Sequence, residues 1–141
     1  ALETCGLADW ETFRELAPHV DLFLYDIKHM DDEAHRRLTG QPNALILDNI
    51  RRLGREKGGN VRIHLRLPLI PGLNDAPEHL DRYGAFAAGL EGIADLELLP
   101  YHRLGKNKYD MLGRGYALGD VPAAVNRVRE HAGHVKVLCV A

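Results

Sequence analysis

Short apolar runs alternate along the chain with stretches of helical spacing. Residues 21–28 form such a run, which contains two aromatic side chains and ends in two charges. A run of this kind predicts a buried strand of a parallel sheet. Side chains alternate along a strand, so Leu22, Leu24, Asp26 and Lys28 are expected to share one face. A charged pair at the end of a buried strand is costly unless it meets a ligand or partner.

The same pattern predicts the other elements. Strands are expected at 1–4, 21–27, 61–67, 95–99 and 134–140. Helical spacing, capping residues and Gly or Pro stops predict helices at 9–16, 31–39, 44–57, 77–90 and 121–132. The stretches 68–75 and 103–119 are expected to be loops.

This order is strand–helix repeated about four times, followed by a closing strand. It predicts an α/β fold of parallel strands joined by right-handed crossovers, with residues 1–141 as a single domain. An open doubly wound sheet and part of a (β/α) TIM-like barrel both fit the pattern. The sequence shows no glycine-rich phosphate turn after a strand, which counts against a dinucleotide-binding site.

Composition excludes several classes of function. The formal charge of −2 gives no electrostatic footprint for nucleic acid or an anionic membrane. No apolar run approaches the ~20 residues of a membrane span. The two cysteines, Cys5 and Cys139, have no metal-ligand spacing and indicate a reducing, cytoplasmic setting. The chain opens on Ala1, as if already inside a strand, which we interpret as the C-terminal portion of a longer protein.

The histidines and lysines in the remaining polar stretches indicate no further site. His29 and His35 are spaced i, i+6 and do not share a helix face, so they do not predict a metal site. His64 is expected to be a satisfied interior histidine. The stretch around Lys106 and Lys108 does not match a phosphate-binding loop.

Polar residues mark the C-terminal ends of the four main predicted strands. They are Glu3-Thr4, Asp26 with Lys28, Arg66, and Tyr101-His102. In a barrel or parallel sheet these ends converge on one mouth. Two cations, two carboxylates and an imidazole suit a small zwitterionic ligand with hydroxyl groups.

Four ordered motifs carry a family resemblance. They are Glu-Thr-Cys-Gly at 3–6, Asp-Ile-Lys at 26–28, Arg-x-Pro-Leu-Ile-Pro-Gly-x-Asn-Asp at 66–75, and Leu-Leu-Pro-Tyr-His-x-x-Gly-x-x-Lys-Tyr at 98–109. The ordered set resembles the glycyl-radical-enzyme activating proteins, a radical S-adenosylmethionine group that includes the pyruvate formate-lyase activating enzyme. The resemblance covers nearly the whole chain.

The resemblance implies a partial (β/α)6 barrel, of which this chain would supply the third to sixth strands and the C-terminal tail. It implies that S-adenosylmethionine lies near Glu3, that Asp26 and Lys28 hold its methionine amino and carboxylate groups, and that His102 approaches its nucleoside. Arg66 matches an arginine at the barrel mouth, near the entry of the partner's glycine-bearing loop.

The resemblance also implies a reaction for the intact protein. A reduced [4Fe–4S] cluster and S-adenosylmethionine generate a 5′-deoxyadenosyl radical, which installs a glycyl radical on a partner enzyme. An electron donor such as flavodoxin or ferredoxin would supply the electron that reduces the cluster. The family's Cys-x-x-x-Cys-x-x-Cys cluster motif is absent from these residues, so the chain provides no metal ligands and is expected to be inactive alone. Partners such as pyruvate formate-lyase, diol or glycerol dehydratases, choline lyase and aryl decarboxylases all remain open.

A barrel aldolase is the alternative function. Lys28 would then form a Schiff base with a carbonyl substrate at a strand end. A Schiff-base lysine must react as the neutral amine, whereas the neighbouring Asp26 favours a charged lysine.

Overall fold

A computed structural model describes residues 1–56, 61–101, 106–115, 118 and 137–139. Five parallel strands form one sheet in the sequential order β1-β2-β3-β4-β5. The strands are β1 (Leu2–Thr4), β2 (Leu22–Asp26), β3 (Arg62–Leu69), β4 (Ile93–Pro100) and β5 (Val137–Cys139). The helices are α1 (Trp10–Leu16), the 3-10 turn η1 (Ala17–His19), α2 (Asp32–Thr39), α3 (Ala44–Arg55), α4 (Pro77–Ala88) and α5 (Lys106–Met111).

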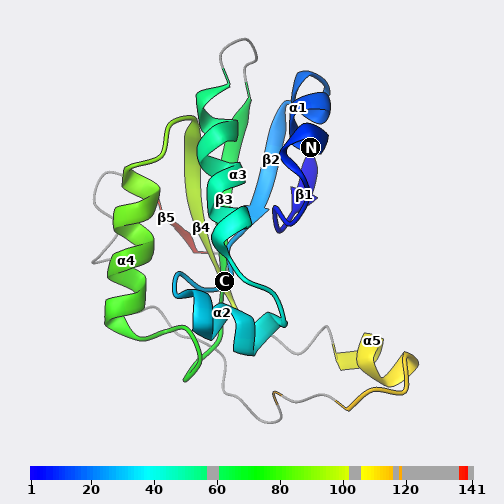
Figure 1. Ribbon diagram of the computed structural model, residues 1–141. Coiled ribbons are helices and arrows are strands. Elements are labelled where there is room, and N and C mark those ends of the chain that lie inside the picture. Colours follow the sequence, from blue (N-terminus) through cyan, green and yellow to red (C-terminus); the bar gives the residue numbers. More distant parts are fainter. Residues whose placement is uncertain (57–60, 102–105, 116–117, 119–136, 140–141) are drawn as a thin grey trace.

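The strand order distinguishes between the two architectures that the sequence pattern left open. Each strand pairs with the strand that precedes it along the chain, and α1, α3 and α4 lie over the same face of the sheet (Figure 1). A doubly wound sheet reverses its strand order at one point and carries helices on both faces. Right-handed crossovers that all advance in one direction place their helices on one face, as in a (β/α) barrel. The predicted α/β class is confirmed, with the strand order of a barrel sector.

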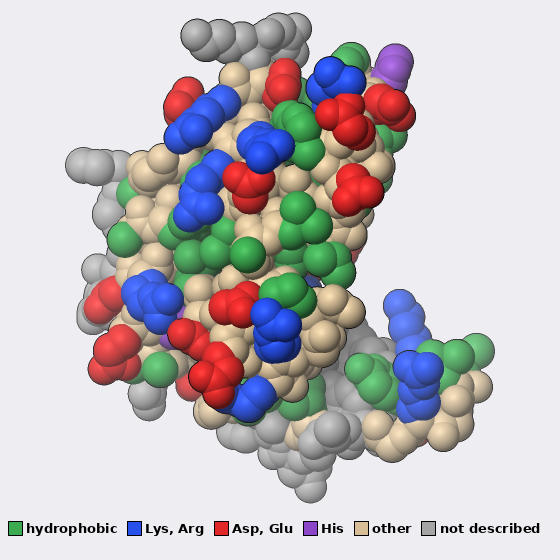
Figure 2. Space-filling view, in the orientation of Figure 1, with side chains coloured by type: hydrophobic (Ala, Val, Ile, Leu, Met, Phe, Trp, Pro, Cys, Tyr) green, Lys and Arg blue, Asp and Glu red, His purple; other side chains and the backbone are tan. Residues whose placement is uncertain are grey.

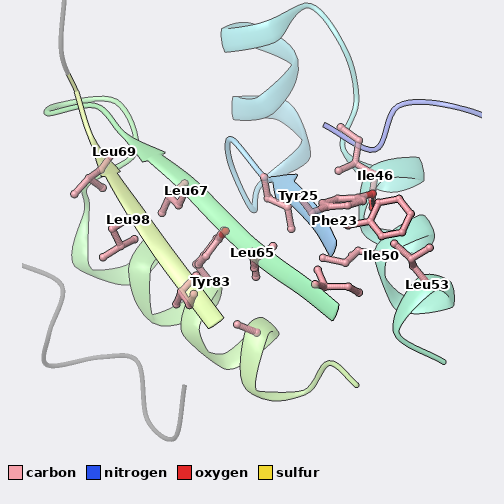
Figure 3. Packing of buried hydrophobic residues seen from close by; sticks show 14 of the residues in the cluster. Phe23, Tyr25, Ile46, Ile50, Leu53, Leu65, Leu67, Leu69, Tyr83 and Leu98 are labelled. Atoms are coloured by element: carbon pink, nitrogen blue, oxygen red, sulfur yellow. Dashed lines mark hydrogen bonds between the residues drawn. The ribbon is translucent and has the colours of Figure 1, made fainter. Parts of the chain in front are cut away.

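The hydrophobic core lies between this sheet and its helices (Figure 3). Alternate residues of the strands point into it, which explains the buried–intermediate alternation along β2 and β3. Burial of each large apolar side chain contributes about 1.5–3 kcal/mol. The strands supply Phe23, Tyr25, Leu65, Leu67 and Leu98, and the helices supply Ile46, Ile50, Leu53 and Tyr83. The intervening strand residues, which include charged side chains, lie on the opposite face.

Two stretches expected to be loops contain regular structure. Pro68 was expected to begin a loop, but β3 continues to Leu69. The carbonyl of Arg66 faces β2 and accepts from Ile27, whereas that of Leu69 faces β4 and accepts from Tyr101. Pro68 therefore faces the β2 side beyond the end of that strand, where its missing N–H removes no ladder bond.

The second such stretch contains α5, within the predicted loop 103–119. Six residues are too few to show a helical hydrophobic period, which is why the sequence pattern missed this helix. The predicted helix at 121–132 lies outside the described residues. Within the described part of the chain, no helix is long and apolar enough to cross a membrane.

Surface charges of both signs are interspersed over the helix-covered face (Figure 2). Several form exposed pairs one helical turn apart, such as Arg52 with Asp48, whose Nε and Oδ2 atoms are 2.9 Å apart. Exposed pairs of this kind contribute about 0.3–0.5 kcal/mol. Their contribution to the stability of the fold is therefore small.

Helix α3 buries a stripe that includes a polar residue. Ile46, Asn49, Ile50 and Leu53 are buried, whereas Leu47 is only partly buried. The Asn49 Nδ2 atom donates to the carbonyls of residues 6 and 8, at 2.9 and 2.8 Å. This contact ties α3 to the loop that follows β1.

Gly54 permits the close approach of α3 to the turn before β4. A Cβ atom at Gly54 would lie 2.1 Å from the backbone oxygen of Glu91. We therefore expect Gly54→Ala to lower the free energy of unfolding by about 2 kcal/mol, because the backbone must shift. Gly89→Ala is the control, since its Cβ would meet only ordinary contacts at 3.6 Å. Equal urea midpoints for the two variants would contradict this expectation.

Candidate functional site

Charged side chains from β1, β2 and β3, and from Lys28 just beyond β2, form a continuous chain of contacts. Arg66 donates from Nη2 to Glu3 Oε1 at 2.6 Å and from Nε to Asp26 Oδ1 at 2.7 Å. Lys28 Nζ donates to Asp26 Oδ2 at 2.7 Å. The side chains of Arg66 and Asp26 are only 11% and 13% exposed. We call Glu3, Asp26, Lys28 and Arg66 the charged quartet.

Strand register explains why these residues meet. Asp26 on β2 is directly opposite Arg66 on β3, and Arg66 is opposite Glu97 on β4. Adjacent strands lie about 4.8 Å apart, so side chains in register on one face are close enough for hydrogen bonds. The structure thus brings together the four charged residues that the sequence proposed for a common mouth beside a fifth, imidazole-bearing residue. His102, the fifth, lies outside the described residues.

The charged quartet is electrically balanced and retains binding capacity. Burial alone lowers the pKa of Arg66, but its hydrogen bonds to Glu3 and Asp26 outweigh burial and raise that pKa, so the guanidinium stays charged. Among the described residues, the recorded contacts engage one of the three Lys28 donors. Each carboxylate oxygen of Asp26 can accept a second hydrogen bond. The arrangement can therefore hold a ligand that carries both an ammonium and a carboxylate group.

A cavity of about 570 Å³ lies beside Lys28. Its lining includes Pro68 and Asn74 from the β3 end and the following loop, Arg37 from α2, and Tyr109 from α5. This volume is within the range typical of small-molecule sites. A smaller hollow of about 220 Å³ lies between α3 and α4, over the helix-covered face, and shares no lining residue with the charged quartet.

His64 and Glu97 form a second polar pair on the same sheet face. The His64 Nε2 atom is 3.3 Å from Glu97 Oε2, and both side chains are mostly buried. The Nε2 atom has no aligned hydrogen-bond partner among the described residues. The expectation of a satisfied interior histidine is therefore wrong for this nitrogen, because the Glu97 contact has the distance but not the direction of a hydrogen bond.

The sequence pattern missed the buried polar side chains behind the charged quartet. Asn43, Asn74 and His79 bind backbone atoms of the loop that follows β2. Asn74 lies within the Pro-Gly-x-Asn-Asp motif, which was the one available signal for it. Throughout the described ranges, no group of three or more His, Cys, Asp or Glu side chains could hold a metal, and Cys5 is a free, exposed thiol.

Known proteins are similar to this chain in sequence and in fold. The isethionate sulfite-lyase activating enzyme of Desulfovibrio desulfuricans is 46% identical over 121 residues, which are 86% of this chain and 38% of the relative. The pyruvate formate-lyase-activating enzyme of Staphylococcus aureus is 43% identical over 111 residues, 79% of this chain and 43% of the relative. This chain is homologous to the glycyl-radical-enzyme activating proteins.

A solved structure of this group agrees with the fold. A domain of the pyruvate-formate lyase-activating enzyme from Bacteroides vulgatus superimposes with a TM-score of 0.74 at 26% identity, covering 99% of this chain and 79% of that domain. No family model matches the chain. The chain spans about two fifths of the length of the Desulfovibrio desulfuricans and Staphylococcus aureus activating enzymes. The family resemblance stated from the motifs is confirmed, while the ligand roles of the charged quartet stay predictions.

Proposed function

We propose that this chain is part of a radical S-adenosylmethionine activating enzyme that installs a glycyl radical on a partner enzyme. In this proposal Glu3, Asp26 and Lys28 bind S-adenosylmethionine together with His102, and Arg66 faces the partner's glycine-bearing loop. The observation that carries the proposal is the charged quartet at the strand ends. The homology of the chain to activating enzymes supports the same proposal.

The charged quartet fits the methionine end of that cofactor. An α-ammonium group requires a carboxylate acceptor, and an α-carboxylate requires a cationic donor. Asp26 and Lys28 provide both within 2.7 Å of each other. Arg66 holds Asp26 from the opposite side and restricts its orientation. Lys28 also lines the cavity of about 570 Å³, which leaves space beside the charged pair.

The described residues position and shield rather than react. S-adenosylmethionine, when bound beside a [4Fe–4S] cluster, supplies the radical that the reaction needs, because cofactors carry such chemistry. Cys5 and Cys139 are the only cysteines of the 141 residues and cannot form the three-cysteine cluster motif. The cluster ligands are therefore proposed to lie outside these residues, and the chain alone to be inactive. A flavodoxin or ferredoxin, in a reducing cytoplasm, would donate the electron.

Asp26→Asn tests the ammonium contact. We expect the dissociation constant of S-adenosylmethionine to rise about tenfold, which corresponds to 1.4 kcal/mol, because the amide keeps the shape but loses the charge. Binding is measured by anaerobic equilibrium dialysis on the whole natural protein with its cluster reconstituted. Asp48→Asn is the matched control, since Asp48 lies in an exposed helical pair with Arg52.

Two results would contradict the proposal. One is an Asp26→Asn protein that binds S-adenosylmethionine as tightly as the wild type and the Asp48→Asn control. The other is a borohydride-trapped adduct of a carbonyl substrate on Lys28, which the aldolase alternative requires. The ion pair of Lys28 with Asp26 disfavours that alternative, since the attacking amine must be neutral.

A further inference from the structure

The backbone that carries Lys28 is held by a buried asparagine. Asn74 Nδ2 donates to the carbonyl of Lys28 at 3.0 Å and to that of Pro68 at 2.7 Å. Its Oδ1 atom accepts from the Ile70 amide at 2.7 Å. The residue is 3% exposed, so water does not compete for these bonds. One side chain thus joins the ends of β2 and β3, and it lines the cavity together with Lys28 and Pro68.

His79 on α4 provides a second contact to the same loop. Its Nε2 atom lies 3.0 Å from the Met30 amide, which can only donate, so Nε2 accepts. In the neutral ring Nδ1 then carries the proton and donates to the carbonyl of Asn74 at 2.8 Å. The ring also stacks on His29, with centroids 4.1 Å apart. His79 therefore links the loop after β2 to the loop that contains Asn74.

Asn43, just before α3, is the third buried side chain that binds this loop. We call Asn43, Asn74 and His79 the clamping side chains. Its Nδ2 atom donates to the carbonyls of His29 and Met30, both at 3.0 Å. The carbonyls of residues 28–30 and the amide of residue 30 are thus all bound by buried side chains. A loop whose backbone groups are bound in this way is rigid, and its rigidity is available to orient Lys28.

We propose that Asn74 is a positioning residue that fixes Lys28 for ligand binding by holding its backbone carbonyl. This inference rests on the proposed function. Of the three clamping side chains, Asn74 is the one that bonds to Lys28 itself. It also bonds to Pro68 and lines the cavity together with both residues. Loss of the amide donors releases Lys28 from the β3 end while its ammonium group stays intact.

A first test needs no ligand. The rate at which acetic anhydride labels Lys28 is measured by mass spectrometry in the whole natural protein, with the exposed Lys108 as internal reference. We expect Asn74→Leu to raise the relative rate about three- to tenfold, which corresponds to the net strength of one hydrogen bond. Asn74→Ala serves if the leucine variant does not fold, because it also removes the amide donors and introduces no charge beside Lys28.

Asn49→Leu is the matched control. Asn49 is also a buried asparagine that donates to two backbone carbonyls, but in the loop after β1. Its loss should reduce stability to a similar degree and leave the Lys28 labelling rate unchanged. An unchanged rate in both Asn74 variants, or equal acceleration by Asn49→Leu, overturns the inference whatever the protein binds.

A second test isolates the route through Lys28. We expect Asn74→Leu to weaken S-adenosylmethionine binding about tenfold in the wild-type background and less than about twofold in a Lys28→Met background. A purely structural effect would be equally large in both backgrounds, and that result overturns the inference. If labelling changes as expected but the wild type binds no S-adenosylmethionine, the proposed function fails and the clamp on Lys28 stands.

Discussion

Replacing Arg66 with methionine is expected to lower the free energy of unfolding by about 3 kcal/mol, because the buried Asp26 carboxylate loses its most buried partner and keeps only the Lys28 contact. Arg66 is the centre of the charged quartet and binds Glu3 at 2.6 Å and Asp26 at 2.7 Å. Methionine retains most of the side-chain volume but none of the donors. Under the proposed function, the rate at which the whole protein installs the glycyl radical on its partner should fall by more than about 100-fold, because Asp26 loses its orientation.

Two comparisons make the Arg66 expectation specific. Arg52→Met removes an exposed pair with Asp48 and a contact with the Trp10 ring, and should cost no more than about 1 kcal/mol. The double variant Arg66→Met with Asp26→Leu removes the stranded carboxylate and should recover part of the lost stability. Urea unfolding of all three proteins measures both effects. If Arg66→Met costs no more than Arg52→Met, the buried ion pair does not have the role assigned to it.

The strand-end residues could be predicted from sequence because two simple rules determine them. Alternation places Asp26 and Arg66 on the sheet face opposite the apolar core residues such as Tyr25 and Leu65. Parallel strands then bring their ends to one edge. The direct contact of Asp26 with Arg66 required more, because it depends on the register of β2 against β3. Register follows from the packing of the whole sheet, which no local pattern specifies.

The clamping side chains could not be predicted for a different reason. Asn74 and His79 bind backbone carbonyl and amide groups of other loops, and these partners have no sequence signature. A buried polar residue in a helix, such as His79 in α4, interrupts the apolar period, and the sequence pattern does not indicate what the residue binds. For Pro68 the sequence rule was too strict. A proline is expected to end a strand, yet β3 continues through Pro68, because its missing donor faces a side where no ladder bond forms.

Acidification from pH 7 to pH 4 is expected to remove about 3 kcal/mol of stability through His79 alone. Its pKa is lowered to about 4, first by burial and then by His29, with Arg82 adding to the shift and the bond to Asn74 opposing it. The unfolded chain binds this proton near pH 6.5, so it holds more protons than the folded chain between pH 6.5 and 4. Stability is therefore complete above pH 6.5 and is lost as the pH falls towards 4.

The pH window separates this loss from that of the carboxylates. The pKa values of Asp31 and Asp32 are lowered by hydrogen bonds, so their contributions disappear only below about pH 4. Proton NMR of the His79 ring gives its pKa directly, and urea midpoints at pH 7.5 and 5 give the stability. In His79→Gln the drop between these two pH values should shrink, although His29, whose pKa burial also lowers, leaves a remainder. A His79 ring that titrates near pH 6.5 would show that protonation does not oppose its bond to the Met30 amide.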